Sequence, residues 1–244
     1  MKSKLAEALG LSAQPVALLR AEQPPEDAMQ PPVDWHGCVI ALLAAASKGK
    51  RVAFREETVG CRGGKGGLAL AETPHEPLTT LLSGGNDKIP GLRYKETEEL
   101  VAAYIDSLPQ ETMTPCLVFC PLDQLAPEEV PSAVVFLVNP DQLSALATLA
   151  NYDNARRDNV KLLFGAGCVQ SVLYSLADEQ AGKKTCTIGL TDPSARLCVG
   201  ADILSFSLPY SRFLELEAQT EKSFLAGEAW QKLKQRMKRK DTAH

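Results

Sequence analysis

Cys116-Leu117-Val118-Phe119-Cys120 and Ala133-Val134-Val135-Phe136-Leu137-Val138 are two apolar runs, and each is bounded by proline residues. Short runs of this kind, rich in β-branched and aromatic residues, are typical of strands that are buried on both faces. We therefore predict that both segments lie in the interior of a β-sheet.

Outward from these two runs, strands and helices follow one another along the chain. Apolar runs predict further strands at 15–20, 51–54, 160–164, 185–190 and 203–208. Helical spacing and start signals predict helices at 3–9, 39–46, 77–82, 96–108, 140–150, 169–177, 210–220 and 223–238. We expect an α/β or α+β fold, a mixed and largely buried sheet flanked by helices. It would form a single domain over 1–244, with a basic helical C-terminal tail at about 223–244.

Composition excludes several classes of protein. The 244 residues are 45% hydrophobic and carry a net charge of −4, which is no general signature of nucleic-acid binding. The longest apolar run, 39–46, is too short to cross a bilayer, and residues 1–7 do not resemble a signal peptide. Seven cysteines, an odd number, favour reduced thiols over a disulfide framework, so we expect a cytoplasmic protein.

A glycine-rich stretch, Gly60-Cys61-Arg62-Gly63-Gly64-Lys65-Gly66-Gly67, follows one predicted strand. Glycines leave backbone N–H groups uncovered, so we expect a loop whose amides surround an anion or cysteine-bound sulfur. Arg62 and Lys65 would favour the thiolate form of Cys61, which attacks electrophiles and binds metals. The spacing is not that of a phosphate-binding loop, so we do not predict a nucleotide site.

Two other cysteines, Cys38 and Cys168, each follow a glycine and precede a helical apolar run. A thiolate at a helix N-terminus accepts N–H groups and meets the positive end of the helix dipole, which lowers its pKa. With Cys61 they form a candidate cage for a [4Fe–4S] cluster, with Gly63, Gly64 and Gly167 supplying amides around it. Zinc could use the same ligands, and each cysteine alone could be a small buried hydrophobe.

The fourth iron of such a cluster could take Cys186, His36 or an exogenous ligand. Asp192 and Arg196 flank a turn, where they could form an ion pair or hold an anionic ligand. If one iron is open, Arg62, Lys65 or Arg196 could position a small anionic substrate. A redox partner protein is the other partner that we expect, and the sequence leaves a homo-oligomer open.

Five short motifs together resemble the domain-of-unknown-function 169 family. They are Gly37-Cys38, Gly60-Cys61-x-Gly-Gly, Phe164-Gly165-x-Gly167-Cys168, Asp192-x-Ser194-Ala195-Arg196 and Ser223-Phe224-Leu225 with the later Trp230. The resemblance implies recurring cysteines at the positions of Cys38, Cys61 and Cys168, in a family found largely in anaerobic bacteria and archaea. An oxygen-sensitive iron–sulfur site would fit that distribution. Some members carry a cysteine where Cys186 falls and others do not, which leaves the fourth ligand open.

Our leading hypothesis is a cysteine-ligated iron–sulfur protein that acts in electron transfer or reductive chemistry. The alternative is a regulatory module in which the thiols hold zinc or a small ligand without turnover. A third hypothesis is a thiol enzyme with Cys61 as the nucleophile.

Overall fold

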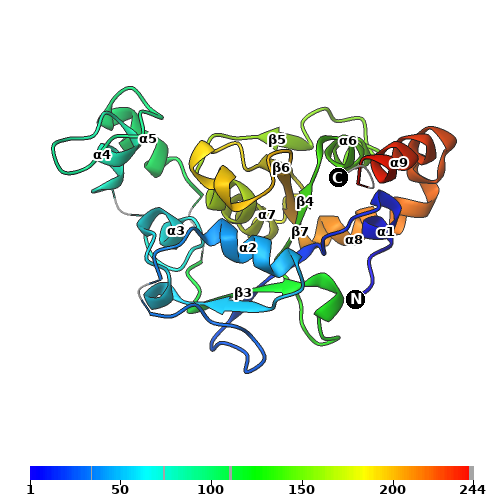
Figure 1. Cartoon of the computed structure of the whole chain (residues 1–244), viewed down its shortest axis with the longest axis horizontal. Helices are drawn as coiled ribbons and strands as arrows, with labels where there is room; N and C mark the ends of the chain where they lie inside the picture. The colour runs from blue at the N-terminus through cyan, green and yellow to red at the C-terminus, as the bar shows by residue number, and fades with distance from the viewer. Residues whose placement is uncertain (34, 74, 110–111, 242–244) are drawn as a thin grey trace.

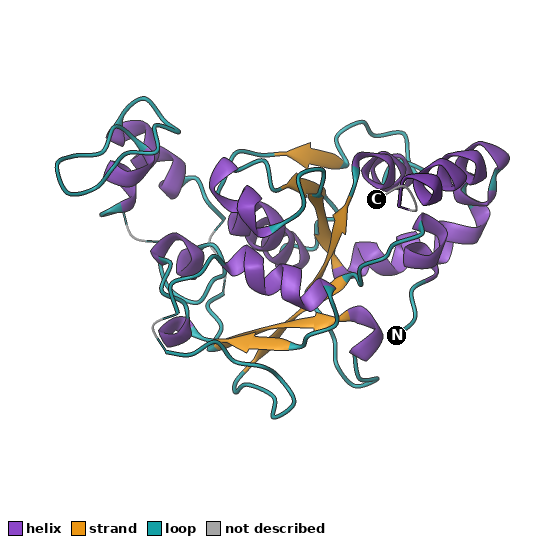
Figure 2. Cartoon of the chain, viewed as in Figure 1, coloured by secondary structure: helices purple, strands orange, loops and turns teal. Residues whose placement is uncertain are grey.

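The computed structural model describes residues 1–33, 35–73, 75–109 and 112–241, with all of their side chains except those of 62 and 238–241. Within these residues, seven strands form one sheet in the order β2-β3-β1-β4-β7-β6-β5, which crosses the middle of the molecule (Figures 1 and 2). The strands are β1 (Val16–Ala21), β2 (Val52–Phe54), β3 (Cys116–Pro121), β4 (Ala133–Val138), β5 (Val160–Leu162), β6 (Cys186–Gly189) and β7 (Leu204–Pro209).

The sheet is mixed, because β5 and β6 run parallel whereas the other neighbours are antiparallel. β4 is the central strand, and β3 lies between β1 and the edge strand β2. Every residue of β3 is buried, as are all but one residue of β4. The prediction of two interior strands is confirmed, and so is the fold class, a mixed α+β sheet flanked by helices.

Helices cover both faces of the sheet and form two core layers. The first layer holds α2 (Val39–Ser47), a π-helical turn η3 (Val169–Leu173) and α7 (Tyr174–Gln180). The second layer holds α1 (Lys4–Leu9), α6 (Pro140–Leu149), α8 (Tyr210–Gln219) and α9 (Glu228–Asp241). Side chains of one strand alternate between the layers, so Phe119 packs in the first and Cys120 in the second.

A small helical lobe extends from the first layer, at the upper left of Figure 1. It contains α4 (Leu78–Leu82) and α5 (Glu98–Asp106), which pack together through Leu78, Val101 and Ile105. Below it lies the short helix α3 (Arg62–Gly66). The remaining turns are 3-10 helices: η1 (Glu56–Thr58), η2 (Leu122–Gln124), η4 (Pro193–Cys198), η5 (Thr220–Lys222) and η6 (Phe224–Ala226).

Two predicted elements differ in the structure. The glycine-rich stretch is not an open loop, because Arg62–Gly66 forms a short helix whose first turn is capped by Cys61. The C-terminal segment is helical as predicted, but Trp230 and Met237 of α9 are buried in the second core layer, so α9 is a packed helix. Residues 242–244 of the predicted tail lie outside the described residues.

None of the helices found in the described ranges combines the length and the apolar character that a membrane span requires.

Candidate functional site

A cavity of about 430 Å³ lies where the helical lobe meets α3, the π-helical turn and the start of η4. Cys38, Cys61 and Cys168 all line it, although they come from three separate segments of the chain. We call it the cysteine cavity. The three predicted ligands are therefore brought to one place by the fold.

Cys61 is the exposed cysteine of the three. It caps the N-terminus of α3, and the backbone N–H of Gly64 donates a hydrogen bond to its Sγ over 3.3 Å. A Cβ on Gly64 would lie 3.5 Å from this sulfur and 3.0 Å from a methyl of Val39. The short helix thus provides an amide for the sulfur, as was predicted for this glycine.

Cys38 precedes α2 and is partly buried, but its thiol makes no capping hydrogen bond to the helix. Burial raises its pKa to about 11, and the neighbouring Cys198 thiol adds to the rise. Our prediction that the helix N-terminus lowers this pKa is wrong, because the loss of water around the thiol outweighs the backbone contribution. The metal-free side chain is a neutral thiol at physiological pH.

Cys168 directly precedes the π-helical turn and is 7% exposed. Its S–H donates to the carbonyl of Gly63 over 3.8 Å, and a Cβ on Gly67 would stand 2.8 Å from its sulfur. Burial raises the pKa of Cys168 far above its usual range, and the nearby Cys61 and Cys38 raise it further. The predicted lowering is wrong here too, for the same reason.

Cys186, predicted as a metal ligand, does not lie with the other three. It begins β6 and is fully buried in the second core layer, on the opposite face of the sheet from Cys168. Burial raises its pKa to about 12, while the neighbouring Arg212 guanidinium opposes that rise. The structure separates it from the cysteine cavity by the sheet itself.

His36 and Asp192 line the cysteine cavity beside the thiols. The imidazole of His36 lies against Gly60, where a Cβ would come within 2.6 Å of its Nδ1. Asp192 accepts hydrogen bonds from the Gly167 N–H at 2.9 Å and from the Ser194 hydroxyl at 2.8 Å. The Gly167 amide is therefore engaged by a carboxylate, whereas we had predicted it to surround the cofactor.

Two of the predicted cations, Lys65 and Arg196, do not line this cavity. Arg196 donates to four backbone carbonyls, those of Leu190, Gly200, Ala201 and Ile203. Lys65 lies 3.8 Å from Glu56. Arg196 thus holds its own loop together, and it does not form the ion pair with Asp192 that we had considered. The side chain of Arg62 lies outside the described residues.

Apolar side chains of the lobe form much of the cavity wall, and the sequence patterns did not single them out. Tyr104 of α5 packs edge to face on Phe164, with ring centroids 5.0 Å apart. The Tyr104 hydroxyl is buried beside Gly165 and has no hydrogen-bond partner among the described residues. The helical spacing of α5 predicted an apolar stripe, but that pattern cannot distinguish a packed helix face from a cavity wall.

No group of three or more His, Cys, Asp or Glu side chains within the described ranges is arranged to hold a single metal ion. The three cysteines come from separate segments that line one cavity. In a [4Fe–4S] cluster each thiolate binds a different iron, so the sulfurs of its ligands are farther apart than those around one ion. Soft thiolates suit either a cluster or zinc, and glycines lie close to two of the sulfurs.

Comparison with protein-family models places residues 4–219 in the domain-of-unknown-function 169 family, which is described as uncharacterised ArCR. The chain belongs to this family. No curated protein and no solved structure matches it. The matched span of this family member includes all of the residues that line the cysteine cavity, and it ends before α9.

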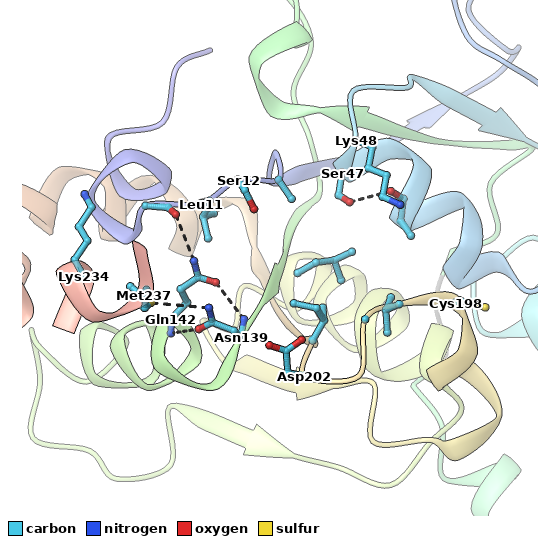
Figure 3. Close-up of a pocket in the computed structure, with 17 residues that line it drawn as sticks. Leu11, Ser12, Ser47, Lys48, Asn139, Gln142, Cys198, Asp202, Lys234 and Met237 are labelled. Atoms are coloured by element: carbon cyan, nitrogen blue, oxygen red, sulfur yellow. Dashed lines mark hydrogen bonds between the residues drawn. The ribbon is translucent and has the colours of Figure 1, made fainter. Parts of the chain in front are cut away.

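A second cavity of this family member, of about 340 Å³, lies between α2, α6, η4 and α9 (Figure 3). Two of its polar side chains are hydrogen-bonded within the protein: Gln142 accepts from the Asn139 N–H at 3.1 Å, and the Ser47 hydroxyl donates to the Ala44 carbonyl. Cys198 lies on its rim with the sulfur directed away from it.

Proposed function

We propose that the cysteine cavity holds a [4Fe–4S] cluster through Cys38, Cys61 and Cys168, and that the protein serves in electron transfer or in a reduction. The observation that carries the proposal is that these three thiols, from separate segments, line one cavity. When bound, such a cluster supplies one-electron transfer. The electrons would come from a redox partner protein.

The chain's own residues would prepare the site in two ways. The Gly64 N–H already donates to the sulfur of Cys61, and hydrogen bonds to ligand sulfurs tune the potential of a cluster. Cys168 is buried, so the protein excludes water on that side and leaves the exposed Cys61 side as the approach for a partner. The glycines at 64 and 67 give the sulfurs room that a side chain would fill.

The fourth coordination position remains with His36 or with a molecule bound in the cavity. Cys186 is removed from consideration because it lies behind the sheet. Thiols that must stay reduced and metal-bound also require a reducing compartment, which supports the assignment to the cytoplasm.

The test is the iron and acid-labile sulfide content of anaerobically purified protein, compared among single variants. We expect about four irons and four sulfides per chain, with both lowered several-fold in Cys38→Ser, Cys61→Ser and Cys168→Ser. Cys186→Ala is the matched control, because it removes another buried thiol on the far side of the sheet and should retain the cluster. Circular dichroism of each variant would show that the fold persists.

Iron-free protein with three titratable thiols would overturn the proposal. Stoichiometric zinc lost from the same three variants would favour the regulatory module instead. Selective and rapid alkylation of Cys61 together with a covalent intermediate would favour a thiol enzyme, for which its exposure makes it the accessible nucleophile.

A further inference from the structure

Part of the wall of the cysteine cavity is built from apolar side chains. Leu78, Leu81 and Leu82 come from α4, Tyr104 and Ile105 from α5, and Phe164 from the segment before the π-helical turn. Phe164 is 43% exposed and Leu92, also on the wall, is 41% exposed. Large apolar side chains held in contact with a cavity favour a ligand that removes them from water.

Charge in the cavity disfavours an anion. Within the described residues, no lysine or arginine side chain lines it, and the carboxylate of Asp192 does. The two predicted cations whose side chains are described are engaged elsewhere, Lys65 with Glu56 and Arg196 with backbone carbonyls. Thiolates binding a metal cluster would add further negative charge. Among the described residues, the cation beside the wall is Lys95, whose Nζ lies 4.2 Å from the Phe164 ring centroid and which does not line the cavity. The described lining therefore offers an anion no cation to offset the loss of its hydration.

One polar group on the wall lacks a partner. The Tyr104 hydroxyl is buried next to Gly165 without a hydrogen bond to any described residue. Buried hydroxyls usually have a hydrogen-bond partner in the protein or a bound water. The Tyr104 hydroxyl thus lies at the apolar wall, among residues that line the cavity.

We propose that the cysteine cavity binds an uncharged, largely apolar organic molecule between the α4–α5 lobe and the three cysteines. The volume of about 430 Å³ lies in the range that suits a small organic ligand. The inference rests on the proposed function in one respect, since this molecule would be the substrate or effector of the same site. It is an alternative to the small anionic substrate expected from the sequence.

The test uses two probes that share one skeleton and differ in charge. N-phenyl-1-naphthylamine is uncharged, and 1-anilinonaphthalene-8-sulfonate carries an added sulfonate. Equilibrium dialysis against the full-length, anaerobically purified chain measures the binding of each probe. We expect one site for the uncharged probe, with a dissociation constant at least about tenfold lower than that of the sulfonate, a difference of about 1.4 kcal/mol.

Two leucine variants locate the binding. Leu92→Arg places a cation on the cavity wall at a partly exposed position. It should lower the affinity for the uncharged probe at least fivefold, on the order of 1 kcal/mol, and raise the affinity for the sulfonate. Leu100→Arg is the control: Leu100 lies on α5 of the same lobe, is 49% exposed and does not line the cavity. We expect it to change neither affinity.

Tighter binding of the sulfonate, or equal effects of the two leucine variants, would overturn this inference. Iron and sulfide measured on the same samples keep it separate from the cluster proposal. Iron without selective probe binding would reject the apolar ligand alone, whereas selective binding to iron-free protein would reject the cluster alone.

Discussion

The absence of a side chain at Gly67 allows two segments of the cysteine cavity to approach each other closely. Gly67 lies where a Cβ would stand 2.8 Å from the sulfur of Cys168, and 3.0 Å from both the Gly63 carbonyl oxygen and a methyl of Val169. Val169 begins the π-helical turn and Cys168 directly precedes it, whereas Gly63 belongs to α3. A hydrogen in place of a side chain therefore lets the two segments pack against each other, with a thiol held between them.

Substituting Gly67→Ala should destabilise the protein and disturb Cys168, because neither the backbone oxygen nor the buried sulfur can give way freely. We expect a loss of about 1–3 kcal/mol in the free energy of unfolding, measured by urea denaturation. Gly84→Ala is the control, since a Cβ there meets nothing within 4 Å. An equal response of the two variants would contradict the packing argument.

A second residue-scale feature is the pairing of Arg212 with Asp153 in the second core layer. The Arg212 side chain is only 4% exposed, and its guanidinium contacts Asp153 and Glu215, each at 2.7 Å. It also donates to the Ala150 carbonyl at 3.0 Å. Hydrogen bonding to Arg212 holds the pKa of the Asp153 carboxyl well below its usual range. A lowered pKa means that the folded state favours the ionised carboxylate.

The stability that this ion pair contributes should depend on pH. It is fully present above the pKa of an unfolded aspartate, about 3.9, and is lost as the pH falls below that value toward the folded pKa. Asp153→Asn should therefore lower the free energy of unfolding by about 1–3 kcal/mol at pH 7, and the difference from the parent should shrink below about pH 4. Urea denaturation at several pH values measures it.

The control for this prediction is Asp158→Asn. Asp158 pairs with Arg156 at 2.9 Å, but both side chains are more than 60% exposed, so solvent screens the pair and we expect no measurable change. A pH-independent loss in Asp153→Asn would show that packing, and not charge, accounts for its effect.

At the scale of elements, the helix that follows the family match is part of the core. α9 buries Trp230, whose indole N–H donates to the Ala8 carbonyl of α1 over 2.9 Å and whose ring packs on Phe224. On its outer face, Lys232 pairs with Glu228 along the helix, and Arg236 pairs with Asp141 of α6. Lys232 and Arg236 thus form ion pairs on the surface of the helix. The apolar face of α9 packs against the second core layer.

Removing the indole should reveal this contribution. We expect Trp230→Ala to lower the free energy of unfolding by about 3 kcal/mol or more, because it leaves a cavity and an unpaired carbonyl in the core. Gln235→Ala, at an exposed position of the same helix, should change it by less than about 0.5 kcal/mol. Thermal or urea unfolding of both variants checks the difference, and a small effect of Trp230→Ala would mean that α9 does not support the core.

At the scale of the whole molecule, the sheet divides the cysteines into two groups. Cys116, Cys120 and Cys186 pack in the second core layer, whereas Cys168 lies in the first and Cys38 packs against it. The lobe of α4 and α5 then covers the thiols of the first side and completes the cavity with apolar side chains. The candidate site lies on one face of the sheet, and the second core layer lies on the other.

The sequence by itself determined the elements and their character. Continuous apolar runs identified β3 and β4, and the Asn139-Pro140 signal located the start of α6, because these patterns reflect local preferences of the backbone and of burial. Glycine contexts singled out Cys38, Cys61 and Cys168, which the fold then brought to one cavity.

Only the tertiary structure decided what depends on distant segments. It placed Cys186 behind the sheet, because one register of β6 sends that side chain to the opposite face. It raised the pKa values of Cys38 and Cys168, because desolvation by packed neighbours outweighs the helix terminus that local sequence reveals. It also turned the apolar stripe of α5 into a cavity wall and tied Arg196 to its own loop, since burial and pairing are set by the whole fold.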